Sequence, residues 1–244
     1  MKIFLIGLFA FSLSFGELPK FLGDPVGHQG DQKLDRRGYT IAYASEFKQA
    51  RWVSYKLSPN RLGGKVVVVK KFRQDQRLKG KKPEEKDYKG SGYNMGYLVP
   101  PKDMKWSGQA LNEVYMMSNT TPQKPFFRKL TWTRLEEKVR AWVKKEGELL
   151  VITGSVLEWG MQTIGENKVI IPDYFYKIIL KKDEKDLKAI AFLAKNERTS
   201  KTLKQLVVPI DSIETLTGLD FFPRLDDRLE KIIETEAYPK KWKF

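Results

Sequence analysis

One predicted helix carries polar side chains at a spacing that places them on one side. Arg128, Trp132, Glu136 and Arg140 follow one another at every fourth position, so their side chains drift only slowly around the helix. With this spacing, the guanidinium of Arg128 is expected to reach the carboxylate of Glu136. The alternative is an ordinary surface pattern in which the two charges do not pair. Because arginine carries only hydrogen-bond donors and a fixed positive charge, Arg128 cannot ligate a metal ion.

Other side chains that enzymes use for catalysis are scarce. The chain has no cysteine and one histidine, His28, which excludes thiol catalysis and zinc sites built on thiolates. His28 lies well before the first predicted strand and would have to fold back to act as a base. Without disulfides, the protein has to be held together by its core alone.

The charge balance is strongly basic. Lys and Arg number 45 against 30 Asp and Glu, a formal net charge of +15. This surplus raises the local concentration of nucleic acid, anionic lipid and acidic polysaccharide, or it serves solubility. Lys70, Lys71 and Arg73 flank Phe72, a mixture typical of grooves that follow a nucleic-acid backbone. A charge cluster on an edge strand is the competing interpretation.

The first sixteen residues have the pattern of a signal peptide. Lys2 is a short positive region, residues 3–15 are almost wholly apolar, and residues 14–16 (Ser-Phe-Gly) offer a cleavage site. The apolar stretch is short for a transmembrane helix, and an uncleaved anchor is the alternative. No later segment is apolar enough to span a bilayer. We therefore expect an exported protein, periplasmic or extracellular, with no integral membrane span after signal removal.

Hydrophobic patterning predicts one α+β domain with a sheet core. The best helix covers residues 126–145, where Leu135, Val139 and Trp142 form an apolar stripe. A short helix at 212–216 and a longer one at 225–236 follow near the end of the chain. Segments rich in β-branched and aromatic residues predict strands, and these lie at 38–44, 51–57, 65–69, 92–101, 113–118, 149–153, 174–180 and 187–194.

Seven segments, in this order, resemble signature segments of the DNA/RNA non-specific endonuclease family, which belongs to the ββα-metal (His-Me finger) superfamily. One such segment alone is weak evidence, but seven in the right order over most of the chain are specific. They are Gly38-Tyr39 with residues 52–57 (WVSYKL), residues 91–100 (SGYNMGYLVP), residues 117–123 (MSNTTPQ), residues 132–136 with Arg140, residues 153–157 (TGSVL), residues 171–177 (IPDYFYK) and residues 217–222 (TGLDFF).

The resemblance implies a ββα-metal finger endonuclease-like fold with a central antiparallel sheet flanked by helices. It divides the chain into a signal peptide (1–16), an extended lead-in (17–37), the endonuclease-like domain (38–236) and a basic tail (237–244). In the implied mechanism a histidine at the end of a strand takes a proton from water. An asparagine early in the following helix holds one Mg²⁺, a glutamate orients the metal's waters, and an arginine contacts phosphate. The last two correspond to Glu136 and Arg140.

The other two functional positions hold different chemistry in this chain. The histidine position is Tyr97, and a phenol has a pKa of about 10 against about 6.5 for imidazole, so it is a poor base at neutral pH. The nearest match to the metal-binding asparagine is Arg128. Asn94 and Met95 replace the aspartate and arginine of the signature. These exchanges predict that the fold is kept and that catalysis is weakened or lost, with the guanidinium of Arg128 substituting for Mg²⁺.

The sequence thus predicts an exported family member that binds DNA or RNA backbones non-specifically through Lys70, Lys71, Arg73, Asn94 and Arg128. Mg²⁺ is expected only if the site is active, and no cofactor otherwise. One alternative is an active Mg²⁺-dependent nuclease with a rebuilt site.

Asn94, Asn112 and Glu136 would surround the metal in such a rebuilt site, with Asn119 as a further ligand. A polar role in a turn or at a strand end is the other interpretation of Asn112 and Asn119, and Asp103 is expected to cap a turn. A third reading is an envelope-associated protein that contacts anionic lipid, glycan or protein.

Overall fold

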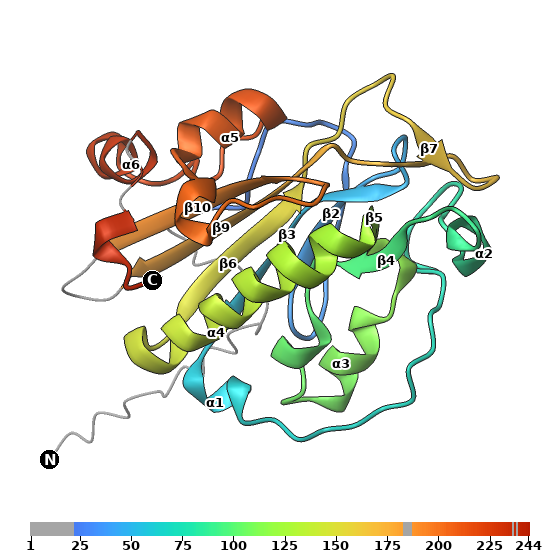
Figure 1. Ribbon diagram of the computed structural model, residues 1–244, viewed down its shortest axis with the longest axis horizontal. Coiled ribbons are helices and arrows are strands. Elements are labelled where there is room, and N and C mark those ends of the chain that lie inside the picture. Colours follow the sequence, from blue (N-terminus) through green and yellow to red (C-terminus); the bar gives the residue numbers. More distant parts are fainter. Residues whose placement is uncertain (1–21, 183–186, 236, 238) are drawn as a thin grey trace, which may run out of the picture.

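The computed structural model describes residues 22–182, 187–235, 237 and 239–244, so the predicted signal peptide lies outside the described residues. A seven-stranded antiparallel sheet runs through the centre of the molecule, with the strand order β1-β2-β3-β6-β9-β10-β11 (Figure 1). Its strands are β1 (Gln32–Asp35), β2 (Thr40–Ala44), β3 (Gln49–Leu57), β6 (Leu149–Ser155), β9 (Tyr174–Lys182), β10 (Leu187–Lys195) and β11 (Val207–Val208).

The central strands are buried on both faces, because each face packs against its own hydrophobic cluster. Side chains alternate between the two faces along a strand. In β9, Phe175 and Ile179 join the first cluster, whereas Tyr176 and Ile178 join the second. The near-continuous apolar runs of these strands follow from this burial on two sides.

Helices cover both faces of the sheet. α4 (Thr133–Glu146) packs on the first cluster through the predicted apolar stripe, including Val139 and Trp142. α5 (Ile210–Thr217) and α6 (Asp227–Glu234) pack on the second cluster, and both lie at the C-terminal end of the described chain (Figure 1). This arrangement confirms the predicted α+β fold with a central sheet flanked by helices. None of the described helices is long and apolar enough to cross a bilayer.

A ββα unit sits beside the sheet. β4 (Asn94–Tyr97) pairs antiparallel with β5 (Thr120–Gln123), and Tyr97 lies opposite Thr120. After β5 the chain forms a π-helical segment, η3 (Phe127–Trp132), which continues into α4. The end of β4 and the start of this helix therefore face a common space. The remaining short elements are α1 (Pro59–Leu62), α2 (Glu85–Tyr88), α3 (Gly108–Val114), β7 (Thr163–Ile164), β8 (Val169–Ile170), η1 (Pro101–Asp103), η2 (Met117–Asn119), η4 (Leu203–Leu206) and η5 (Pro239–Lys241).

Two predicted strands are wrong. Residues 65–69 are extended but join no sheet, and Val67 and Val69 are more than four-fifths exposed. Residues 113–118 lie at the end of α3 and the start of η2 instead. In both segments β-propensity was present without a neighbouring strand to pair with, and propensity alone does not form a sheet.

Both ends of the described chain join the fold. Gln32–Asp35 forms edge strand β1 within the predicted lead-in, and Val26 pairs with Asp220. In the predicted basic tail, Trp242 is 1% exposed, packs against Trp142 and donates a hydrogen bond from its indole nitrogen to the carbonyl of Ala189 at 3.2 Å.

Gly96 is required by the close approach of β4 and β5. A methyl group at this position would lie 2.2 Å from the side chain of Gln123, which is fully buried. We expect Gly96→Ala to lower the free energy of unfolding by about 1–3 kcal/mol, the usual cost of overpacking, as measured by urea denaturation. Gly63→Ala is the control, because Gly63 has open space around it and should change stability by less than about 0.5 kcal/mol. Equal effects of the two variants would contradict the packing argument.

Candidate functional site

A pocket of about 290 Å³ opens where β4 and the π-helical segment face each other. It lies on the side of the sheet covered by α4, since Tyr97 and Trp132 belong to the first cluster. The pocket is lined by Tyr97, Pro100, Pro101, Lys102, Gln123, Arg128, Trp132, Thr133 and Glu136.

Tyr97 is buried at the last position of β4. Only 7% of its surface is exposed, and its ring contacts Phe72 and Tyr115 at centroid distances of 6.0 and 6.1 Å. Burial raises the pKa of Tyr97 to about 12, although the nearby guanidinium of Arg128 opposes the shift. Burial therefore favours the protonated phenol at neutral pH.

Two stacked aromatic rings with a cation at each end form one row beside the pocket. The ammonium of Lys70 lies 5.1 Å from the ring centre of Phe72, Phe72 stacks on Tyr97, and the guanidinium of Arg128 lies 5.1 Å from the centre of Tyr97. Each contact is a cation–π or ring-stacking interaction. The row brings together two of the basic residues predicted to bind phosphate, Lys70 and Arg128, that lie far apart in the sequence.

Arg128 does not pair with Glu136, contrary to the expected ion pair. Its Nη1 donates a hydrogen bond to the carbonyl of Met95 in β4 at 2.5 Å. No ion pair joins Arg128 and Glu136 in the part of the chain that the structure describes. Burial raises the pKa of Glu136, and the charge of Arg128 opposes this rise. The physical reason is the π-helical segment, in which the amide of Thr133 bonds to the carbonyl of Arg128. This wider turn breaks the regular spacing that the prediction assumed.

Charged side chains of the interior interact electrostatically with Glu136. Lys177 projects from β9 toward α4, is 1% exposed and lies with its ammonium 4.9 Å from the ring centre of Trp132. Burial raises the pKa of Glu136, and Lys177 is the strongest of the cations that oppose this shift. Arg140 donates to Asp103 at 3.0 Å.

The carboxylate of Asp103 also accepts a hydrogen bond from the hydroxyl of Tyr55 at 3.0 Å. The hydrogen-bond partners of this carboxylate are thus side chains, and η1 has no side-chain cap among the described residues, so the predicted role of Asp103 as a turn cap is not confirmed. Asp103 and Glu136, with the cations Arg140 and Lys177, form a group of charges at the base of the pocket.

Several buried donors at or beneath the pocket find no hydrogen-bond partner among the described residues. They are Nε2 of Gln123, Nε1 of Trp132, Nη2 of Arg140 and Nζ of Lys177. Buried donors are normally paired. The donors of Gln123 and Trp132 belong to lining residues and, with the charges of Lys102 and Arg128, suit a ligand that has several acceptor oxygens.

The comparisons with known proteins agree with the ββα unit. A sequence profile of the DNA/RNA non-specific endonuclease family matches residues 21–228. The chain belongs to this family. Human mitochondrial endonuclease G is 29% identical over 228 residues, covering 86% of this chain and 74% of that protein. Nuclease C1 of Cunninghamella echinulata var. echinulata is 29% identical over 210 residues, covering 79% and 83%.

A solved structure supports the fold of this family member. The crystal structure of the EndoG/EndoGI complex matches with a TM-score of 0.76 at 24% identity, covering 82% of this chain and 89% of that chain. The predicted ββα-metal fold and the predicted family are thereby confirmed.

Nucleases of this family are metal-dependent and typically use Mg²⁺, but the residues of this pocket do not fit such an ion. Mg²⁺ prefers six oxygen ligands. Among the described lining residues only Glu136 is a carboxylate, and the amide of Gln123 is the one further side chain with a carbonyl oxygen. Arg128 and Lys102 bring positive charge to the same space, and Lys177 lies next to Glu136. We therefore derive no metal-dependent step for this chain.

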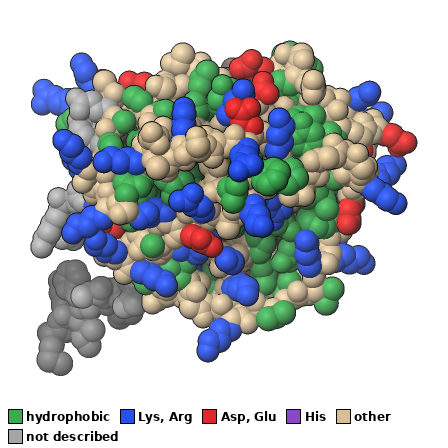
Figure 2. Space-filling model, in the orientation of Figure 1, with side chains coloured by type: hydrophobic (Ala, Val, Ile, Leu, Met, Phe, Trp, Pro, Cys, Tyr) green, Lys and Arg blue, Asp and Glu red, His purple; other side chains and the backbone are tan. Residues whose placement is uncertain are grey.

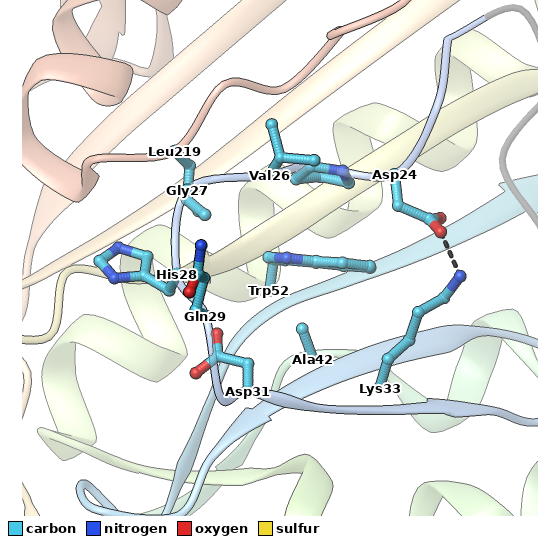
Figure 3. Close-up of a pocket in the computed structure, with 11 residues that line it drawn as sticks. Asp24, Val26, Gly27, His28, Gln29, Asp31, Lys33, Ala42, Trp52 and Leu219 are labelled. Carbon is cyan, nitrogen blue, oxygen red and sulfur yellow. Dashed lines mark hydrogen bonds and ion pairs between the residues drawn. The ribbon is translucent and has the colours of Figure 1, made fainter.

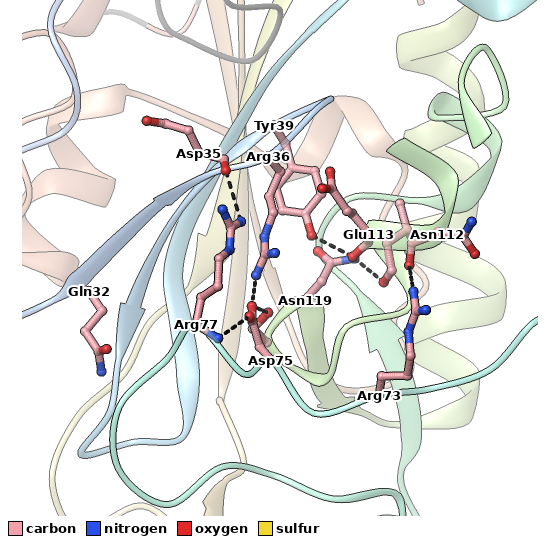
Figure 4. Close-up of polar contacts among 12 residues, drawn as sticks. Gln32, Asp35, Arg36, Tyr39, Arg73, Asp75, Arg77, Asn112, Glu113 and Asn119 are labelled. Carbon is pink, nitrogen blue, oxygen red and sulfur yellow. Dashed lines mark hydrogen bonds and ion pairs between the residues drawn. The ribbon is translucent and has the colours of Figure 1, made fainter. Parts of the chain in front are cut away.

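Asn119 does not fit the predicted role of a metal ligand. It is fully buried, and its amide accepts from the nitrogen of Val99 and donates to the carbonyls of Val99 and Val114, at 2.9–3.0 Å. The carbonyl of Asn112 accepts from Arg73 at 3.1 Å. Figure 4 shows Asn119 near the buried ion pair of Arg36 with Asp75 and Asn112 beside Arg73, so both asparagines make structural contacts.

The other predicted site residues lie around the pocket without lining it. Asn94 is exposed at the first position of β4, and Lys71 and Arg73 are exposed on the segment that follows residues 65–69. Arg140 lies beneath the pocket and contacts Asp103. Among the predicted residues, Tyr97, Arg128 and Glu136 are brought together in the pocket itself.

His28 lies on the opposite face of the sheet. Its Nε2 hydrogen-bonds the carbonyl of Thr217 at 2.7 Å, and it borders a separate pocket of about 490 Å³ beside Trp52 (Figure 3). Trp52 belongs to the second cluster and Tyr97 to the first. The sheet therefore separates His28 from Tyr97, and His28 does not line the pocket that contains Tyr97.

Sequence reasoning missed Lys102, Gln123 and Lys177 as functional candidates. Lys177 offers the one usable signal, because it is a single charge inside the apolar run Tyr-Phe-Tyr-Lys-Ile-Ile-Leu. A lysine at an inward position of a strand buried on both sides needs a partner. Gln123 and Lys102 have no such signal, since only the folding of the ββα unit brings them to the pocket.

Proposed function

We propose that this chain binds the phosphate backbone of DNA or RNA without sequence preference and that it hydrolyses phosphodiesters weakly or not at all. We also propose that it is exported, on the strength of the apolar leader at residues 3–15. Because the chain belongs to a family of DNA and RNA nucleases, we take nucleic acid as its ligand class. The observation that carries the proposal is the pair of substitutions at the pocket, Tyr97 and Arg128.

The two substitutions remove the chemistry of hydrolysis. A phenol whose pKa is raised to about 12 by burial takes no proton from water at neutral pH. The loss of a general base typically costs a factor of about 10²–10⁴ in rate. A guanidinium at the other position carries charge but holds no water in a reactive geometry.

The same substitutions favour binding. Arg128, Lys102 and the amide of Gln123 line the pocket, and arginine recognises phosphate oxygens through several donors at once. Lys70 and Phe72 extend this surface as a cation and a ring. Figure 2 shows Lys and Arg side chains spread over the visible face, with Asp and Glu side chains fewer on it.

Nicking and binding measured on one preparation test the proposal. Supercoiled plasmid with Mg²⁺ or Mn²⁺ should show no nicking above that of the metal-free reaction. Duplex and single-stranded DNA should both bind, and the logarithm of the affinity should fall linearly with the logarithm of the salt concentration, with a slope of about −0.9 per phosphate contact on duplex. Arg128→Ala should weaken binding about tenfold, whereas Arg134→Ala, an exposed arginine on α4 outside the pocket, should change it much less.

The contrary outcomes are equally definite. Metal-dependent nicking that Tyr97→Ala abolishes would show that this chain is an active nuclease with a rebuilt site. A flat salt response would remove nucleic acid as the partner and favour another polyanion.

A further inference from the structure

Acidic side chains gather on α5 and α6, far from the pocket described above. Asp211 and Glu214 of α5 and Glu234 of α6 each have a carboxylate oxygen within 4.8 Å of those of the other two. Both helices pack on the second cluster, whereas the pocket with Tyr97 belongs to the first. The acidic group therefore lies across the sheet from the pocket, and its function is separate.

Glu234 is the member that needs an explanation. It is only 4% exposed, and its Oε1 has no hydrogen-bond partner among the described residues. A buried carboxylate without a partner is costly, and buried charges are normally paired or coordinate a metal. A carboxylate oxygen of Glu234 lies within 4.8 Å of oxygens of the other two carboxylates, so this buried side chain points into the group.

Positive side chains do not supply the missing partner. The chain contains 45 Lys and Arg, yet in residues 22–182, 187–235, 237 and 239–244 none forms an ion pair with Asp211, Glu214 or Glu234. The charges with the largest effect on Glu234 are all negative and include Glu230 and Asp220. Such a concentration of negative charge in a strongly basic protein calls for a cation from solution.

Glu214 is already oriented for a ligand. Its Oε1 accepts a hydrogen bond from the backbone nitrogen of Phe221 at 2.8 Å, which fixes the carboxylate relative to α5. Asp211, one turn earlier on the same helix, is exposed. The group thus has one buried, one half-buried and one exposed carboxylate, so a cation held there would keep access to water on one side.

We propose that Asp211, Glu214 and Glu234 bind one Ca²⁺ ion that ties α6 to α5. Three carboxylates without nitrogen or sulfur ligands suit a hard cation, and Ca²⁺ accepts such oxygens in flexible geometry at about 2.3–2.6 Å. Two ligands on opposite sides of Ca²⁺ lie up to about 5 Å apart, which accommodates oxygens within 4.8 Å of one another. Mg²⁺, with bonds of about 2.0–2.1 Å, requires a tighter group.

Protons are the competing occupants of this group. Burial and the neighbouring carboxylates raise the pKa of Glu234 to about 9, and burial raises that of Glu214 to about 7. A protonated pair would need no metal ion. Direct uptake of Ca²⁺ distinguishes the two states, because protonated carboxyl groups without a site do not take up a stoichiometric ion.

The experiment uses the full chain after treatment with a chelator. Calorimetric titration should show one Ca²⁺ bound, and Ca²⁺ at a hundredfold excess over its Kd should raise Tm by on the order of 5 °C. Glu234→Gln keeps the shape and removes the charge, so it should abolish both effects. Glu137→Gln, on the exposed side of α4, is the matched control and should leave both unchanged.

Asp211→Asn covers the case in which Glu234→Gln does not fold. Asp211 is exposed, so this variant should fold normally and bind Ca²⁺ at least tenfold more weakly. Absence of Ca²⁺ uptake by the unchanged protein would overturn the proposal, as would uptake that persists undiminished in the folded variants. Stoichiometric binding of Mg²⁺ without Ca²⁺ would overturn the assignment of the ion. None of these readouts depends on nucleic-acid binding or cleavage.

Discussion

Exchanging Tyr97 for histidine and Arg128 for asparagine in one protein is expected to produce Mg²⁺-dependent plasmid nicking at least about 100-fold above that of the unchanged chain. Imidazole titrates near neutral pH and supplies the base that the buried phenol cannot. The amide oxygen of asparagine is a ligand for Mg²⁺, and loss of the guanidinium removes a positive charge from the space beside Glu136. The measurement is the rate of plasmid nicking with and without Mg²⁺.

Single variants serve as controls for this gain. Tyr97→His alone gains a base but keeps Arg128 where the metal has to bind, and Arg128→Asn alone gains a ligand but no base. Each should nick far more slowly than the double variant, because the two groups act together. A double variant that keeps its thermal unfolding transition and nicks no faster than the unchanged chain would show that other residues separate this chain from its active relatives.

Lys177→Met is expected to lower the free energy of unfolding by about 1–3 kcal/mol, because it removes the positive charge that most strongly balances the carboxylate of Glu136. Lys177 is 1% exposed, and its charge is the main one that stabilises the carboxylate of Glu136. Without Lys177, Arg140 is left to balance the carboxylates of Glu136 and Asp103. Urea denaturation measures the loss, and Lys182→Met, at an exposed position of the same strand, should cost less than about 0.5 kcal/mol.

A second substitution and the pH dependence test the electrostatic origin of this loss. Lys177→Met combined with Glu136→Gln should recover most of the stability, because it removes the unbalanced charge. Burial raises the pKa of Glu136 above its ordinary value of 4.5, so the folded state binds more protons than the unfolded state above that pH. Stability from this group is therefore lost as pH rises, and Lys177→Met should be more damaging at pH 8 than at pH 5. An equal loss at both pH values would indicate a packing defect.

The spacing of hydrophobic residues was enough to predict the long helix and the central strands, whose side chains are buried. The stripe of Leu135, Val139 and Trp142 located the long helix, and the apolar runs at 149–153, 174–180 and 187–194 located three central strands. These predictions succeeded because both faces of the sheet are covered, so side-chain polarity follows the position in the fold. The valine-rich run at 65–69 failed for the complementary reason, since it has no neighbouring strand.

The contacts of the site depended on features that local sequence does not show. Tyr97 and Arg128 were found by counting along the family's signature segments, but their contact across the pocket comes from the pairing of β4 with β5. The predicted Arg128–Glu136 pair failed at the π-helical segment, where one wider turn changed the direction of Arg128. No residue in Phe-Arg-Lys-Leu-Thr-Trp predicts the wider π-helical turn, because packing of the surrounding elements determines the helix type there.

The buried Trp242 has a consequence for proteolysis near this end of the described chain. Trp242 completes the packing around Trp142, and the indole of Trp142 also donates to the carbonyl of Lys243 at 2.8 Å. Proteolytic removal of residues 239–244 would therefore expose the ring of Trp142 to water.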